Sequence, residues 1–252
     1  MYKHYIVMSS AFTLGTRIAL DYIIENDNDI EAVKQDMKYI QENAQNDIHL
    51  SSHFISTNSK DWESVEKIDA FFSNVKLINT KEEFLKYIDQ DTELKGLDVA
   101  KYILSKCPCT HLKLEKMVYF AYADYMVKTG KKLFDDNIFA YKLGPVIESV
   151  YKKYKKRKTI LFIEEEDDKM VEDETKLTMP LRSRIMSSKD GLEKVFSIDE
   201  TISKYKDAKA YDLVKLTHKK NSPWKMAGGY IRNNSIKITD QLIKDYHLNE
   251  QN

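Results

Sequence analysis

The sequence predicts an α+β protein in which a small α/β unit over residues 1–92 precedes a mainly helical domain over residues 96–252. Two observations predict this class. In the first part, short apolar segments rich in strand-forming residues alternate with amphipathic segments, whereas from Gly96 onward apolar residues recur every three or four positions. The hydrophobic share of 42% is enough for a substantial core, and the charged share of 32% is typical of a helix-rich surface.

The composition argues against several classes of function. Forty basic and forty acidic side chains cancel, so the whole chain has no net field that favours nucleic acid or an anionic membrane. Only seven glycines are present, and neither glycine-rich phosphate-binding motif occurs, so no cofactor is expected. The first residues lack the apolar segment of a signal peptide, and no run is long enough for a transmembrane helix. We therefore expect a cytoplasmic protein that does not contact membranes.

The first 92 residues are expected to alternate strands with helices. The expected strands are 4–9, 48–57 and 75–79. The expected helical segments are 13–45, interrupted by a turn and a new N-cap in "ENDNDIEA", then 59–74 and 80–90. Thr80 and Glu83 have the spacing of a capping box. The pattern assigns no function to this unit, but it favours a structural or partner-binding role over ligand sensing, because the dinucleotide-binding glycines are missing.

Two cysteines and a histidine lie together in "CPCTH", residues 107–111. Three soft ligands within five residues resemble half of a zinc site, but a structural site needs four ligands and no second Cys/His cluster follows. We therefore expect no bound metal. Pro108 is interpreted as a helix stop, and Thr110 as the start of the next helix.

The longest expected helix runs from Thr110 to a glycine cap at Gly130. On a helical wheel its expected core stripe is Leu114, Val118, Ala121, Tyr122 and Tyr125. Phe120 and Val127 fall on the opposite side, among the charged residues Lys113, Lys116, Asp124 and Lys128. An apolar pair within a charged rim is typical of an interaction surface. Cover by another part of the same chain is equally compatible with the pattern.

A charged insertion is expected around residues 155–200. The basic run "KKYKKRK" at 152–158 is followed by the acidic segments "EEEDD" and "EDE", a combination typical of a solvated loop. The basic run alone would attract nucleic acid, but the acidic block beside it cancels much of that attraction. Binding to nucleic acid is therefore not expected.

Two further motifs have both a structural and a functional interpretation. In "YKLGPV", Gly144–Pro145 predicts a turn into a helix that has Pro145 at its first position. Tyr141 and Lys142, at the entrance to this turn, have the composition of an interface hot spot. In "LTHKKNSPW", His218 ends a helix, and Pro223–Trp224 closes the loop that follows. A catalytic His218 would need a nucleophile or metal partner, which the sequence does not supply, so a structural clasp is favoured.

Four separated motifs resemble those of the Panacea antitoxin domain, a family that includes SocA-like proteins. They are "KMVYFAY" at 116–122, with Tyr119 and Tyr122, "LFDD" at 133–136, "AYKLGPV" at 140–146 and "LTH" to "PW" at 216–224. The resemblance extends over residues 96–247, and residues 1–92 lie outside it. Ala123–Asp124 departs from the Gly–Trp that many members carry at this point.

The resemblance implies an antitoxin that binds a protein toxin and neutralises it, with the toxin encoded beside it in a bacterial or prophage genome. Some members are instead proteolytic adaptors, so a protease is the second class of partner. An enzyme that uses His218 or the N-terminal unit is the least favoured hypothesis, and no catalytic residue is expected. The expected contact residues are Lys116, Phe120, Asp124, Val127, Tyr141 and Lys142. The expected structural residues are Tyr119, Tyr122, Gly144, Pro145, His218, Pro223 and Trp224.

Overall fold

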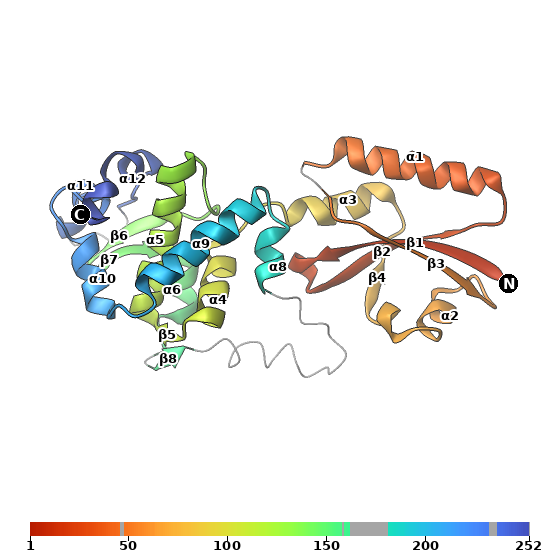
Figure 1. The fold of residues 1–252 in the computed structure, drawn as a ribbon, viewed down its shortest axis with the longest axis horizontal. Helices are drawn as coiled ribbons and strands as arrows, with labels where there is room; N and C mark the ends of the chain where they lie inside the picture. Colours follow the sequence, from red (N-terminus) through yellow and green to blue (C-terminus); the bar gives the residue numbers. More distant parts are fainter. Residues whose placement is uncertain (46–47, 158, 162–180, 232–235, 252) are drawn as a thin grey trace. The chain divides into compact units, whose positions relative to one another are not determined.

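The computed structural model describes residues 1–45, 48–157, 159–161, 181–231 and 236–251. These residues form two compact units (Figure 1). The first comprises Met1–Thr92 together with Ser187–Lys189, and the second comprises the remaining described residues from Glu93 onward. A sheet dominates the first unit and helices dominate the second, so the expected α+β class is confirmed.

The first unit is built on a four-stranded mixed sheet with the strand order β3-β1-β2-β4. The strands are β1 (Tyr2–Ala11), β2 (Thr16–Ile23), β3 (Ser51–Thr57) and β4 (Val75–Leu77). β1 pairs antiparallel with both β2 and β3, and β4 joins β2 in parallel. The helices are α1 (Asp27–Asn43), α2 (Trp62–Glu66) and α3 (Lys81–Gln90), with a 3-10 turn at Ala70–Phe72.

Both faces of this sheet are covered, so the unit has two small cores. α1 and α3 lie on one face and α2 lies on the other (Figure 1). Successive residues of a strand point to opposite faces. Accordingly Val7 packs in the core that includes Ile40 of α1 and Phe84 of α3, whereas Ile6 packs with Phe72 on the opposite face. Both cores are therefore formed by residues of this unit itself.

The expected helix over residues 13–24 is wrong, because this segment forms β2. The chain reverses at Gly15, whose φ of 68° is in the left-handed region that favours glycine. Ile18 and Tyr22 are four residues apart, a spacing that suits one face of a strand as well as one face of a helix. The long register with β1 selects the strand.

Several helix ends agree with the sequence analysis. The N-cap expected in "ENDNDIEA" is Asn26, whose side chain accepts the Asn28 N–H at 2.9 Å. Thr80 Oγ1 accepts the Glu83 N–H at 3.2 Å and begins α3. The segment expected as a helix over 59–74 is shorter than expected, because only α2 and the following 3-10 turn are helical.

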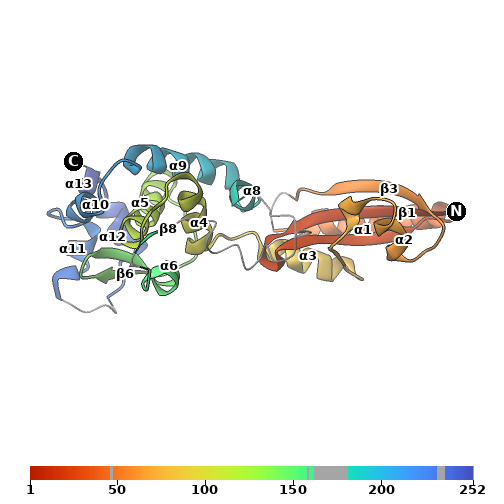
Figure 2. The same cartoon turned by 90° about the horizontal axis from the view of Figure 1, so that it is seen from below.

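The second unit surrounds one central helix, α5 (His111–Thr129). The elements packed around it are α4 (Gly96–Lys106), α9 (Gly191–Tyr205), α10 (Ala210–Thr217), α12 (Asp240–Tyr246) and the hairpin of β6 (Ile138–Tyr141) and β7 (Gly144–Ile147). Figures 1 and 2 both show α10 and α12 near the C-terminus of this unit. The shorter elements are β5 (Cys109–Thr110), α6 (Glu148–Tyr154), β8 (Ile160–Leu161), α8 (Leu181–Met186), α11 (Pro223–Met226), a 3-10 turn at Gly229–Ile231 and α13 (Leu248–Gln251).

The helix boundaries expected around "CPCTH" and Gly130 are confirmed. α4 ends at Lys106, Thr110 Oγ1 accepts the Lys113 N–H at 3.4 Å, and Gly130 ends α5 with a φ of 75°. Both cysteines are free and buried, and burial raises the pKa of the Cys109 thiol to about 12. Within the described ranges, no group of three or more His, Cys, Asp or Glu side chains is placed to hold a metal ion.

The charged insertion expected around 155–200 is only partly described. Its acidic segments, residues 163–176, and Lys158 lie outside the described residues. The end of the range is not a solvated loop. Val195 and Ile198 of α9 are buried in the core around α5.

Candidate functional site

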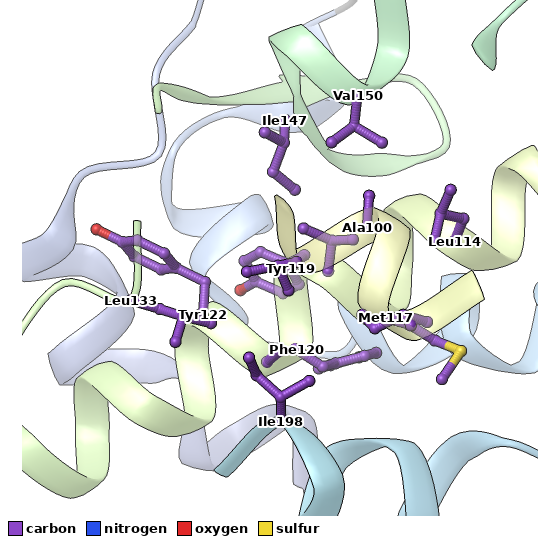
Figure 3. Close-up of a cluster of buried hydrophobic side chains, with 14 of the residues drawn as sticks. Ala100, Leu114, Met117, Tyr119, Phe120, Tyr122, Leu133, Ile147, Val150 and Ile198 are labelled. Carbon is purple, nitrogen blue, oxygen red and sulfur yellow. The ribbon is translucent and has the colours of Figure 1, made fainter. Parts of the chain in front are cut away.

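The central helix α5 is buried along most of its length, so of the two interpretations of Phe120 the structure supports cover by another part of the same chain. Every residue from Leu114 to Ala123 is buried. Phe120 has 0% exposure and stacks on Tyr205 of α9, with ring centroids 4.7 Å apart. Figure 3 shows it close to Ile198 of the same helix. The wheel assumed one exposed side, but a helix with neighbours all round buries apolar residues on every side.

Two other residues of that expected face are partly covered. Val127 is half-buried. Asp124 is half-buried as well, and its carboxylate lies 2.6 Å from His247 Nε2 and accepts a hydrogen bond from Gln251. The expected contact surface of Phe120, Val127 and Asp124 is therefore not a continuous exposed patch.

Lys116 and Glu115 place two charged side chains inside the core, where they hold the β6–β7 hairpin. Lys116 Nζ donates to the backbone oxygen of Pro145, and Glu115 Oε2 accepts the Ile147 N–H at 3.1 Å. Burial lowers the pKa of Lys116 to about 8, and Glu115 and Glu250 partly oppose this shift. Buried charges persist only where partners satisfy them. Lys116 is a core residue, and its expected place on an exposed rim is wrong.

The hairpin itself replaces the turn-to-helix transition expected at Gly144–Pro145. Pro145 lies in β7, where it pairs with Ala140 of β6. The helix α6 begins three residues after Pro145, at Glu148. The fixed φ of proline suits a strand as well as the first position of a helix, so the motif did not decide between them.

Gly144 is required for this hairpin to pack on α5. Its φ is 105°, a value that L side chains rarely adopt. A Cβ at this position would lie 2.6 Å from Thr217 Oγ1 and 3.1 Å from Lys116 Nζ. The backbone of Gly144 therefore packs directly against the side chains of Thr217 and Lys116, with no room for a Cβ.

His218 and Trp224 have the geometry of a clasp. Their rings stack with centroids 3.8 Å apart and planes inclined by 22°. Trp224 Nε1 donates to the backbone oxygen of Tyr141 at 2.7 Å, which ties α11 to the end of β6. Pro223 is at the first position of α11. Burial lowers the pKa of His218, and Lys116 and Lys225 lower it further, so the imidazole is neutral near pH 7.

A pocket of about 350 Å³ lies beside the two-residue turn between β6 and β7. Its walls come from the first turns of α5, from the hairpin and from α6. Of the six expected contact residues, it brings together Lys116, Tyr141 and Lys142. The other three, Phe120, Asp124 and Val127, do not line it.

A buried polar network around His247 lies outside the sites that were expected from the sequence. Its two ring nitrogens lie 2.6 Å from carboxylate oxygens of Asp124 and Glu250, and the Tyr119 hydroxyl donates to Glu250 at 2.9 Å. Burial disfavours the charged imidazole, but the hydrogen bonds to Asp124 and Glu250 outweigh it and raise the pKa of His247. Burial also raises the pKa of Glu250. Only the His–Glu spacing of three residues was visible in the sequence, because α5 and the C-terminal helices are remote along the chain.

One comparison with known proteins matches this arrangement to a family model. The family model described as "Antitoxin SocA-like, Panacea domain" matches residues 114–225. The matched range begins in α5, ends in α11 and includes the hairpin and the His218–Trp224 pair. The resemblance inferred from the four motifs is therefore confirmed over this range, which is narrower than the 96–247 expected.

No curated protein and no solved structure matches the chain. Across the part of the chain that the structure describes, no helix combines the length and the apolar character needed to cross a membrane.

Proposed function

We propose that this protein is an antitoxin that binds a protein toxin directly and neutralises it in a stoichiometric complex. The observation that carries this proposal is the match of the SocA-like antitoxin domain to residues 114–225. We further propose that the toxin is the product of an adjacent gene and that the complex forms in the cytoplasm. A neutralising complex of this kind requires neither a cofactor nor a catalytic group.

The environment of His218 supports binding rather than catalysis. Its Nε2 atom is buried and has no hydrogen-bond partner among the described residues. A general base needs a reacting proton within hydrogen-bond reach and a group that orients its ring. The face of the ring is instead stacked on Trp224.

The β6–β7 turn is the surface that we propose for the toxin contact. Tyr141 is half-buried, Lys142 is exposed, and Leu143 is 42% exposed. The turn is held from below by the Trp224 hydrogen bond to Tyr141 and by the packing of Gly144. A loop fixed before binding loses less conformational entropy in a complex, so more of the contact energy appears as affinity.

Co-expression tests the proposal. The full chain and the product of the neighbouring gene are expressed together, growth is scored, and the two proteins are co-purified. Rescue of growth with a co-purifying complex is expected, in a normal host and in one that lacks its cytoplasmic proteases. Rescue that disappears without a protease would replace direct neutralisation with proteolytic delivery. Rescue without any complex would contradict both mechanisms.

A further inference from the structure

The pocket beside the β6–β7 turn has more positive than negative charge facing it. Lys116 is in its wall, and Lys142 and Lys155 are exposed at its rim. A charge that is enclosed by protein is screened much less by salt than an exposed one. The enclosed charges of Lys116 and Glu115, which both line the pocket, largely offset each other, so the excess positive charge is that of the two rim lysines.

The acidic groups near the pocket are already engaged within the protein. The Glu115 carboxylate accepts the Ile147 N–H at 3.1 Å and lies 3.3 Å from His111 Nε2. The carboxylate of Glu148, whose charge helps to raise the pKa of Tyr141, forms an ion pair with Lys152 at 2.8 Å. Lys142 and Lys155 have no ion-pair partner among the described residues. Lys116 offsets the charge of Glu115, and Lys152 offsets that of Glu148, so the excess charge facing the pocket is the positive charge of Lys142 and Lys155.

The side walls of the pocket are aromatic and apolar. Tyr141 and Tyr151 meet edge to face with ring centroids 5.0 Å apart, and Leu112 and Val146 also line the space. A volume of about 350 Å³ is at the lower end of the range of about 300–1,000 Å³ that is typical of small-ligand sites. The pocket is therefore of a size for one or two side chains rather than for a folded element.

We infer that this pocket takes an acidic side chain of the toxin together with a neighbouring aromatic side chain. The inference rests on the proposed antitoxin function and specifies the chemistry of the partner segment. The carboxylate meets the lysines, and the ring packs against Tyr141 and Tyr151. Aromatic anchors within a charged rim are typical of the few residues that dominate the affinity of an interface.

A toxin-independent experiment tests the pocket first. The full chain is titrated with the blocked dipeptide N-acetyl-Glu-Phe-amide and with its uncharged analogue N-acetyl-Gln-Phe-amide, and NMR signals of fluorinated tyrosines are followed. The acidic peptide is expected to bind about tenfold more tightly, which corresponds to about 1.4 kcal/mol, and to shift Tyr141 and Tyr151. Equal binding of the two peptides, or shifts that leave both tyrosines unchanged, would overturn the inference.

Charge reversal at the rim provides the second test. The double variant Lys142→Glu, Lys155→Glu is expected to lose the preference for the acidic peptide and to need at least about tenfold more protein to neutralise the toxin. The control for a single charge reversal outside the pocket is Lys209→Glu, an exposed position at the start of α10 that does not line the pocket. It is expected to behave like the wild type. Thermal melts verify that both variants are folded.

The two proposals fail in different ways. If the wild type neutralises the toxin and the folded double variant does so equally well, the pocket inference is wrong and the antitoxin function stands. If the wild type forms no complex with the toxin, the antitoxin function is wrong. In that case the dipeptide titration still shows whether the pocket prefers an acidic ligand.

Discussion

Four ionisable side chains inside the helical unit determine how its elements fit together. Lys116 and Glu115 bind the backbone of β7, while His247 and Glu250 tie the C-terminal helices to α5. Removing one partner of a buried ionic pair costs about 3–5 kcal/mol, because the other is left uncompensated. These residues therefore specify which surfaces of α5 meet the hairpin and the C-terminus, and apolar packing supplies most of the stability.

Phe120→Ala should behave as a core substitution. The ring is fully buried against Tyr205, so its removal is expected to cost about 3–5 kcal/mol in the free energy of unfolding. Urea denaturation measures this loss. Val127→Ala is the control, since its side chain is half-buried on the same helix and should cost clearly less. An unchanged stability with weakened toxin binding would restore Phe120 as a contact residue.

Replacement of His247 should give a stability change that depends on pH. The folded-state pKa of His247 is raised above its ordinary value of 6.5, so its contribution is fully present below that value and is lost as the pH rises through the folded pKa. His247→Gln should cost about 1.5–3 kcal/mol near pH 6, the range for hydrogen bonds to charged groups, and less near pH 9. Denaturation curves of both proteins at the two pH values measure the difference. A loss that is equal at both would show that the charge of His247 plays no part.

At the scale of elements, the hairpin is the part of the helical unit on which the proposed contact depends. The Trp224 hydrogen bond fixes its first strand, and Gly144 allows its second strand to approach α5. Lys142 and Leu143 are consequently presented on a short turn between two anchored strands. A change that moves the hairpin should reduce binding even when it leaves the exposed residues intact.

Gly144→Ala tests this dependence. The positive φ alone costs about 1–3 kcal/mol for a residue with a Cβ, and the contact with Thr217 Oγ1 at 2.6 Å adds to it. Toxin affinity should fall along with stability. Gly130→Ala is the control, because Gly130 also has a positive φ but a Cβ there would meet nothing within 4 Å. It should cost only about 1 kcal/mol and leave binding unchanged. Equal effects of the two substitutions on binding would exclude a special role for the hairpin.

The elements that could be predicted are those fixed by local chemistry. Thr110 and Gly130 mark the ends of α5 through a hydroxyl cap and a left-handed backbone, and both signals are local. β2 and the β6–β7 hairpin were missed because tertiary pairing selects the strand where the spacing of apolar residues is ambiguous. For the candidate site, the motifs placed Tyr141 and Lys142 at a turn and Trp224 at the end of a loop, and the structure has them there, while their role in binding stays a prediction. The burial of Lys116 and Phe120 was not, because it depends on how many elements surround α5.

At the scale of the whole molecule, only the helical unit has a match that suggests a function. The helical unit carries the match to the antitoxin domain, and its core residues coincide with the motifs that first suggested the family. The sheet unit of residues 1–92 lies outside that match, and its helices cover both faces of the sheet. We propose that it serves a structural or partner-binding role, in keeping with its lack of a glycine-rich phosphate-binding motif.

The central claim is that this protein neutralises a toxin by binding it. Purified full-length protein is titrated against a fixed amount of the toxin in the cell-free assay that the toxin inhibits. Direct binding predicts that rescue rises linearly and is complete at a fixed molar ratio close to the stoichiometry of the isolated complex, with no added cofactor. An enzyme would inactivate many toxin molecules per molecule of protein. Rescue that continues to grow with time at a small fraction of that ratio would contradict the account.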